Sequence, residues 1–156
     1  MSYDTLSNYL GYIEEAFLAY KTERYNIKGK DVVAGNCKYY LNDLSFKNFL
    51  YPGFAYGVGY LLENAVYLEL RRLGYIVYTG SFRDKEIDFV AMKDDRVIYL
   101  QATYMLETAQ TMEREYAPLL TRGDNYEKYV VSMDEVQFPS NEGVRHIQAW
   151  NLKEIL

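Results

Sequence analysis

The sequence has few of the residues on which several protein classes depend. One cysteine, Cys37, and one histidine, His146, occur among its 156 residues. A single cysteine excludes a disulfide within the chain and a cysteine-rich zinc site, and is typical of a reducing compartment. No run of about 18 apolar residues occurs, so we expect no membrane span. No basic segment followed by an apolar one opens the chain, so we expect a cytoplasmic protein.

Basic charge is scarce as well. The net charge is −5, which argues against nucleic-acid binding through the overall charge of the protein. Any DNA contact therefore has to rely on local basic patches. Hydrophobic residues make up 49% of the chain and 18 tyrosines dominate its aromatic residues, a composition that excludes a disordered chain. The length predicts one globular domain, or one domain with a short appendage.

Gly29-Lys30 is the one place that suggests a phosphate-binding loop. The loop motif requires a glycine five residues before the Gly-Lys pair and a serine or threonine after it. Arg24 and Asp31 occupy those positions. We therefore expect no nucleotide site of this kind in the chain.

Residues 1–50 are predicted to form an appendage, a helix followed by a β-hairpin. Apolar residues at helical spacing predict the helix, with Leu6, Leu10, Ile13, Phe17 and Tyr20 as its inward side. Residues 25–27 and 38–41 are short strand candidates joined by a loop. The hairpin is either a DNA-contacting wing, with Lys28 and Lys30 on phosphates, or a solvated hairpin packed on its neighbour. Residues 42–59 are predicted to be an irregular connection.

Residues 51–156 are predicted to form the main domain, of mixed α/β class. The pattern predicts a helix over 58–73, three antiparallel strands near 75–79, 86–91 and 97–104, a helix over 108–120, and strands at 128–133 and 144–150. A terminal helical turn follows at 152–156. In the second strand, Ile87, Phe89 and Ala91 are expected to alternate with Glu86, Asp88 and Val90.

A few polar residues on these apolar elements are candidates for function. Asp88 lies in a strongly apolar strand, where an aspartate is costly unless it meets a cation or a donor, so it belongs either to a functional site or to a buried structural pair. Glu63 and Glu69 lie at the apolar stripe of the 58–73 helix, and each is otherwise an ion-paired or solvated helix residue. His146 has no partner nearby in sequence, and we expect it to be structural.

The predicted order of elements resembles that of the restriction-endonuclease-like PD-(D/E)XK fold: a helix, three strands, a second helix and a fourth strand. A closer resemblance, over nearly the whole chain, is to the C-terminal domain of bacterial and archaeal AAA-type ATPases. The stretches that carry it include "YYLNDLSFKN", "LLENAVYLELRRLGYIVYTG", "KEIDFVA", "YLQATY" and "DNYEKYVVSMDE". In that family the segment before the core looks like part of a winged helix. The resemblance implies an ATPase module upstream or in trans.

The resemblance also implies a site. Glu63 matches the helix carboxylate, Asp88 the strand carboxylate and Gln101 the third-strand ligand, the three together holding Mg²⁺. Thr103 stands where the motif has its lysine. Lys85 is a candidate for the missing lysine at a shifted position in the sequence. It lies two residues before Ile87, however, so alternation along the strand predicts that it faces away from Asp88.

Three functions remain open from the sequence. The first is a nuclease-type DNA-binding domain, weakly active or inactive, coupled to an ATPase. The second is an interaction or regulatory module for that ATPase, which suits the acidic charge and the many tyrosines. The third is an active Mg²⁺-dependent, structure-selective endonuclease.

Overall fold

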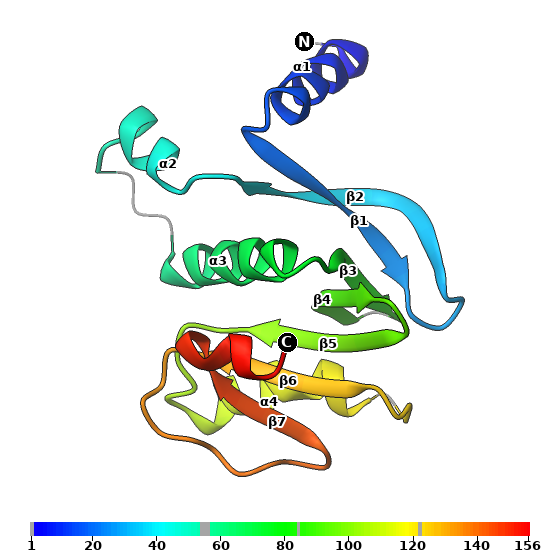
Figure 1. Ribbon diagram of the computed structural model, residues 1–156, viewed down its shortest axis with the longest axis vertical. Helices are drawn as coiled ribbons and strands as arrows, with labels where there is room; N and C mark the ends of the chain where they lie inside the picture. The colour runs from blue at the N-terminus through cyan, green and yellow to red at the C-terminus, as the bar shows by residue number, and fades with distance from the viewer. Residues whose placement is uncertain (1, 54–56, 84, 122) are drawn as a thin grey trace.

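A seven-stranded mixed sheet organises the computed structural model, which describes residues 2–53, 57–83, 85–121 and 123–156 (Figure 1). Its strand order is β2-β1-β3-β4-β5-β6-β7. The strands are β1 (Ala19–Asn26), β2 (Asp31–Leu41), β3 (Ile76–Phe82), β4 (Lys85–Lys93), β5 (Arg96–Ala102), β6 (Glu127–Ser132) and β7 (Val144–Gln148). The helices are α1 (Tyr3–Glu15), α2 (Ser45–Leu50), α3 (Val58–Arg72), α4 (Ala109–Leu120) and the 3₁₀ helix η1 (Ala149–Glu154).

The predicted α/β class is confirmed. The elements α3, β3, β4, β5, α4 and β6 follow one another in the expected order. β3, β4 and β5 form the predicted antiparallel meander, whereas β6 pairs with β5, and β7 with β6, in parallel. A parallel neighbour requires a crossover, and α4 supplies it between β5 and β6. The assignment of this order to the restriction-endonuclease-like fold stays a prediction.

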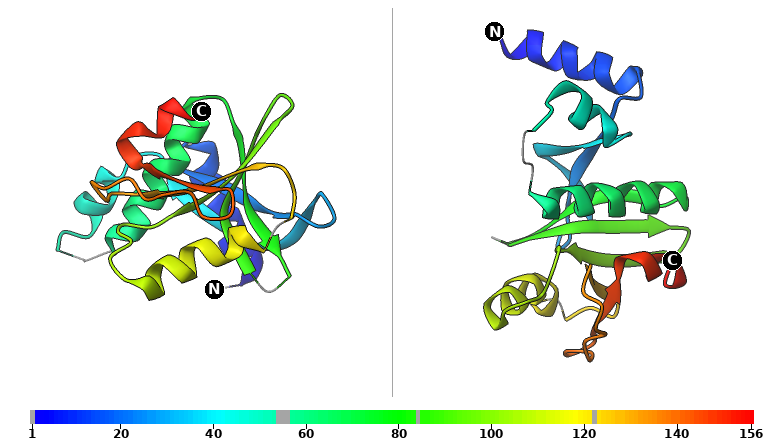
Figure 2. Two further views of the ribbon diagram at one scale, coloured as in Figure 1. Left: turned by 90° about the horizontal axis from the view of Figure 1, so that it is seen from below. Right: turned by 90° about the vertical axis from the view of Figure 1, so that its left-hand side faces the viewer.

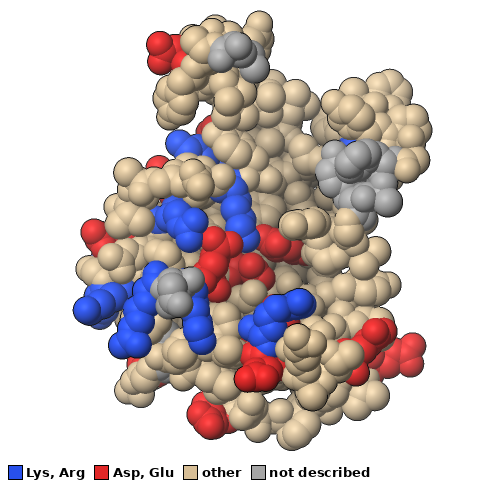
Figure 3. Space-filling model, turned by 180° about the vertical axis from the view of Figure 1, so that it is seen from behind, with Lys and Arg blue, Asp and Glu red and all other residues tan. Residues whose placement is uncertain are grey.

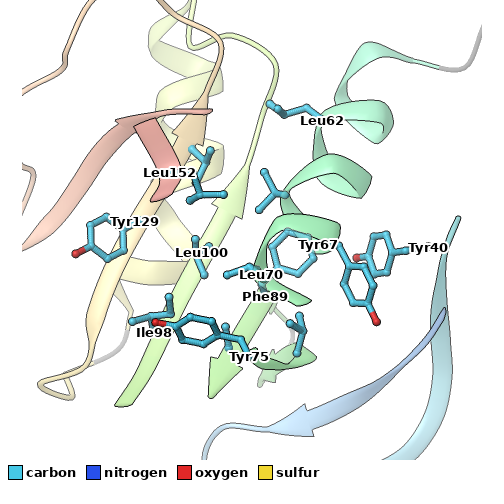
Figure 4. Close-up of a cluster of buried hydrophobic side chains, with 14 residues drawn as sticks. Tyr40, Leu62, Tyr67, Leu70, Tyr75, Phe89, Ile98, Leu100, Tyr129 and Leu152 are labelled. Atoms are coloured by element: carbon cyan, nitrogen blue, oxygen red, sulfur yellow. The ribbon is translucent and has the colours of Figure 1, made fainter. Parts of the chain in front are cut away.

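Helices cover both faces of the sheet (Figure 2). On one face α3 and η1 pack over a core in which Phe89, Ile98 and Leu100 lie under Leu70 and Leu152 (Figure 4). On the other face α4 buries Tyr116 and Leu119 against the sheet residues Ile87, Val90, Tyr99 and Val130. Successive side chains of β5 point to opposite faces of the sheet, so Ile98 and Leu100 pack into the first core and Tyr99 packs into the second.

The hairpin is longer than predicted and is part of the sheet. β1 pairs in parallel with β3 from Arg24 opposite Thr79 to Asn26 opposite Ser81. The prediction of a loop over residues 28–37 is therefore wrong for residues 31–37, which belong to β2, although the pairing with β1 is interrupted between Val33 and Lys38. The Asn26 side chain instead closes a short turn by accepting bonds from the backbone N–H groups of Lys28 and Gly29, each 3.0 Å long. The proposed boundary at residue 50 stays a prediction.

Two details of the N-terminal half differ from expectation. The first helix begins after Ser2, whose side chain accepts a bond from the Thr5 amide, and it ends at Glu15. No residue of α1, all of which the structure describes, is buried: Leu6 and Ile13 of the predicted inward stripe are exposed and Leu10 is half-buried. Tyr20, the last residue of that stripe, instead lies on β1 and packs against the core. A short helix, α2, replaces part of the irregular connection predicted over 42–59, of which residues 54–56 lie outside the described residues. Among the described residues, no helix is both long and apolar enough to cross a membrane.

Candidate active site

Three carboxylates converge on the ammonium group of Lys38, which β2 carries. The Nζ atom lies 2.9 Å from Glu63 Oε1, 3.0 Å from Glu86 Oε1 and 3.5 Å from Asp88 Oδ1. Glu63 comes from α3, and the other two acids come from β4. Figure 3 shows acidic side chains gathered in the middle of one face of the molecule, with lysine and arginine side chains on either side. The site thus joins three elements that are far apart in the sequence.

A buried asparagine fixes α3 against the end of β2. Asn64 Oδ1 accepts a 2.8 Å bond from the Leu41 amide, and Asn64 Nδ2 donates a 2.9 Å bond to the Leu41 carbonyl. The neighbouring residue, Glu63, accepts a 2.7 Å bond from the hydroxyl of Tyr40. Lys38 and Tyr40, two residues apart on one face of the strand, therefore both reach Glu63.

A β-bulge positions Asp88. Tyr78 pairs with Val90 and Gly80 pairs with Ile87, so Thr79 alone stands opposite two residues, Asp88 and Phe89. A bulge of this kind redirects the side chains on the longer strand. The predicted strict alternation of Ile87 with Asp88 and Val90 is therefore wrong, since Ile87 and Val90 pack into the same core cluster.

Gly80 makes room for the bulge. It lies inside β3, and a Cβ atom there would stand 2.8 Å from Val90 Cγ2 and 3.1 Å from Ile87 Cβ. Both contacts are shorter than a relaxed carbon–carbon distance of about 3.5 Å. The absence of a side chain thus lets β3 and β4 stay paired on both sides of Asp88.

Gln101 lies next to Asp88, as predicted. The β4–β5 backbone ladder ends at Phe89 opposite Leu100. Beyond that pair, side chains replace the ladder: Gln101 Oε1 accepts a 3.2 Å bond from the Asp88 amide, and Asp88 Oδ2 accepts a 2.9 Å bond from the Ala102 amide. Each side chain thereby satisfies a backbone donor of the opposite strand.

The other two predicted site residues, Thr103 and Lys85, both of which the structure describes, form no hydrogen bond or ion pair with the carboxylates. Thr103 is buried and donates its amide to the carbonyl of Val131, which continues the pairing of β5 with β6. Lys85 lines a pocket on the α4 face together with Met112 and Tyr116. The lysine that the structure brings to the carboxylates is instead Lys38.

Sequence reasoning missed Lys38 because 25 residues separate it from Glu63 and 50 from Asp88. A signal was nevertheless present. Lys38 precedes Tyr40 by two residues, so in a strand it shares the face of Tyr40, which is buried. A lysine on such a face requires an acidic partner.

Burial dominates the electrostatics of the cluster. Burial, together with the negative charge of Glu63, raises the pKa of Asp88 to about 7. Burial lowers the pKa of Lys38, but the charges of Asp88 and Glu63 outweigh it and the pKa is raised above its ordinary value. The pKa of Tyr40 is also raised, by burial and by Glu63. Around neutral pH the cluster therefore holds a fixed ammonium and an aspartic acid that titrates.

The donor chemistry of the cluster fits a hard divalent cation. Mg²⁺ binds through one or two carboxylates, with waters and substrate oxygens completing its shell, and Glu63 and Asp88 provide that pair. Both already direct an oxygen at one cationic nitrogen, that of Lys38. No set of three or more acidic, histidine or cysteine side chains among the described residues is arranged to hold a metal ion. Further ligands would therefore have to come from Gln101, water or substrate.

His146 is structural, as expected. Its Nδ1 accepts a bond from the Phe138 amide, and its Nε2 lies 2.8 Å from Ser132 Oγ. Ser132 also contacts Asp134, 2.7 Å away, and all three polar side chains are buried. Because the hydroxyl of Ser132 is committed to these partners, the set connects β6, β7 and the loop between them.

Comparison with known proteins finds relatives but no family model and no solved structure that match this chain. An uncharacterized protein of Haemophilus influenzae is 37% identical over 128 residues, which are 82% of this chain and 31% of that protein. An uncharacterized protein of Methanocaldococcus jannaschii is 30% identical over 119 residues, which are 74% of this chain and 26% of that protein. The chain thus corresponds to about a third or less of each of these longer relatives.

Proposed function

We propose that the chain is a cytoplasmic, nuclease-like domain that acts on DNA in concert with an AAA-type ATPase module, on the same polypeptide or in trans. The observation that carries the proposal is the convergence of Glu63 and Asp88 on Lys38, with Gln101 bonded to the Asp88 backbone. Two acids can hold Mg²⁺ for phosphodiester hydrolysis, and a lysine beside them can stabilise the negative charge that develops on the phosphate.

Each residue has a definable task in such a reaction. Glu63 and Asp88 would hold Mg²⁺, which supplies positive charge to the phosphate and lowers the pKa of a bound water. Lys38 would place its ammonium beside the phosphate oxygens, where negative charge develops. Tyr40 keeps the Glu63 carboxylate oriented through its 2.7 Å bond. Lys38 in this role would replace the lysine that is missing at Thr103.

The local charge supports a DNA substrate despite the acidic chain. Arg24 contacts Glu86 at 3.0 Å, on the rim of the carboxylate cluster. Arg114, 71% exposed, pairs with the buried Glu115, whose negative charge contributes to the raised pKa of Asp88. Lysine and arginine side chains thus surround the acids, as Figure 3 shows. Phosphate groups are attracted by such local clusters even when the net charge is unfavourable.

The test is cleavage of branched and linear DNA with Mg²⁺ or Mn²⁺. We expect the wild type to cut and the Asp88→Asn and Lys38→Met variants to lose at least about 100-fold in rate, the scale of losing one electrostatic contact to a developing charge. Lys153→Met, at an exposed lysine of η1, is the matched control. Equal cutting by wild type and Asp88→Asn would indicate a contaminating nuclease and overturn the proposal.

The second candidate function is an interaction or regulatory module for the ATPase. The observation that favours it is α1, which carries exposed Tyr9, Tyr12 and, just beyond its end, Phe17. In Figure 1 this helix extends away from the sheet. An exposed aromatic surface of this kind is typical of protein contacts. Under this reading DNA binding is absent at about 50 mM salt, where phosphate contacts are strongest.

A further inference from the structure

Two turns that carry basic side chains lie side by side at one end of the sheet. The first follows β1, and the second follows β3. These strands are parallel neighbours, paired up to Asn26 opposite Ser81, and the Ile27 amide continues the pairing with a 3.0 Å bond to the Ser81 carbonyl (Figure 1). Parallel strands that pair up to their last residues end at the same end of a sheet. Lys28 and Arg83, which come next in each turn, are therefore neighbours in space.

Each turn carries two cations. Lys28 and Lys30 belong to the first turn, whereas Arg83 directly follows β3 and Lys85 begins β4. Lys28, Lys30 and Arg83 are exposed, and Lys85 is half-buried. No acid among the described residues forms an ion pair with any of the four. Arg83 lies over the ring of Phe82, 5.3 Å from its centre, a contact that does not neutralise its charge.

The acids near these turns are fewer than the cations. Residues 28–31 and 83–85 contain four basic residues and two acidic ones, Asp31 and Asp84, in a chain whose net charge is −5. Asp84 lies outside the described residues. Glu113 lines the same pocket as Lys85 without forming an ion pair with it, and Glu86 is paired with cations of the β1–β2 hairpin instead. The two turns thus have an excess of positive charge.

The turns lie close to the carboxylate cluster. Lys85 and Asp88 are three residues apart on β4, which is about 10 Å along a strand. On β1, Arg24 contacts Glu86 of the cluster and precedes Lys28 by four residues. One strand of duplex DNA has a phosphate for about every 3.4 Å of helix axis, so about three nucleotides span the distance from the cluster to the turns.

We infer that Lys28, Lys30, Arg83 and Lys85 form the surface that binds the phosphate backbone of DNA, about three nucleotides from the phosphate at the carboxylate cluster. The inference rests on the proposed function and names the contacts that hold its substrate. Contacts to phosphates fix the position of DNA without reading its sequence. Binding through these four residues is therefore independent of sequence and weakens strongly with salt.

An acidic protein segment is the competing partner, because it also carries negative charge. An extended chain of glutamates has at most one charge for about every 3.3 Å of its length. Duplex DNA has one for about every 1.7 Å of helix axis, counting both strands. Four cations that two adjacent turns gather within a small area are matched better by the higher charge density, which favours DNA.

The experiment measures binding of the full chain to a fluorescent 20-bp duplex between about 50 and 200 mM KCl, without divalent metal. Four phosphate contacts predict a slope of about −3.6 in a plot of log K against log salt, a loss of about 100-fold over this range. Lys28→Gln/Lys30→Asn and Arg83→Asn/Lys85→Gln should each make the slope shallower by about 1.8. Asparagine replaces Lys30 and Arg83 because their φ angles are 59° and 56°, a region that asparagine tolerates.

Lys153→Glu is the matched control, since it changes the net charge as much as either double variant and lies on η1, next to the other edge of the sheet. It should leave the slope unchanged, and circular dichroism establishes that each variant is folded. A slope that neither double variant changes, or equal affinity for a 20-residue polyglutamate, overturns this inference and leaves the cleavage test of the proposed function in place. Failure of the wild type to bind DNA at about 50 mM salt overturns both.

Discussion

Replacing Lys38 by methionine tests the carboxylate cluster directly. Methionine keeps most of the side-chain volume and removes the ammonium that lies within 3.5 Å of Glu63, Glu86 and Asp88. Removing one partner of a buried ion pair costs about 3–5 kcal/mol. Lys38 is 30% exposed, so water recovers part of that cost. We expect a loss of about 2–3 kcal/mol of unfolding free energy at pH 8.

The loss should be smaller at low pH. Asp88 in the folded state keeps its proton up to about pH 7, against an ordinary pKa of 3.8. At pH 6 the carboxyl of Asp88 is therefore largely neutral, and two acids rather than three repel one another once Lys38 is gone. We expect the cost of Lys38→Met to fall to about 1 kcal/mol there.

Urea unfolding at pH 6 and pH 8, followed by circular dichroism, gives both numbers. Lys28→Met, in the exposed turn between β1 and β2, is the control for adding an exposed methionine. About 10 mM Mg²⁺ should stabilise Lys38→Met more than the wild type, because the variant leaves the acids free for a divalent ion. If Lys38→Met unfolds within about 0.5 kcal/mol of the Lys28→Met control at both pH values, the electrostatic reasoning is refuted.

Three further predictions concern stability. The raised pKa of Asp88 means that the folded protein holds more protons than the unfolded chain between pH 3.8 and about 7, so stability should fall as pH rises through that window. Asp88→Asn should flatten this dependence in urea titrations; an unchanged slope would contradict it. Burial lowers the pKa of His146 below 6.5, so its contribution to stability should be lost as pH falls below that value, and His146→Gln should lose less on acidification than wild type. Asn64→Ala should cost about 2–3 kcal/mol and speed hydrogen exchange at the Leu41 amide, since both bonds to that residue disappear; wild-type protection at Leu41 would show that the asparagine does not hold the strand.

The sequence alone predicts the central part of the fold well. The helix from 58 to 72 and the strands that follow can be predicted from the spacing of their hydrophobic residues, because each element buries one face against a continuous core. The hairpin is predicted less well, since its length depends on the pairing of β1 with β3, which local sequence does not encode. Helix α2 is missed because its six residues are too short to show a helical period.

Prediction of the site follows the same division. The resemblance predicts Glu63, Asp88 and Gln101 as a group, and the structure places them in one network. The edge strand β2 brings Lys38 to the acids through a tertiary contact; its spacing from Tyr40 indicates a shared face but not the partners it meets there. The bulge at Asp88 depends on which residue lies opposite it, Thr79, and hence on strand register rather than on composition.

The bonds between Asp88, Gln101 and Ala102 have a practical consequence for enzymology on this domain. Two side chains assigned to chemistry also close the open end of a strand pair, where they replace ladder bonds that the backbone does not make. A substitution at either position thus loosens the sheet at the same time as it alters the proposed site. Loss of activity in such a variant is interpretable only beside a melting curve, and double substitutions at 88 and 101 will not be additive.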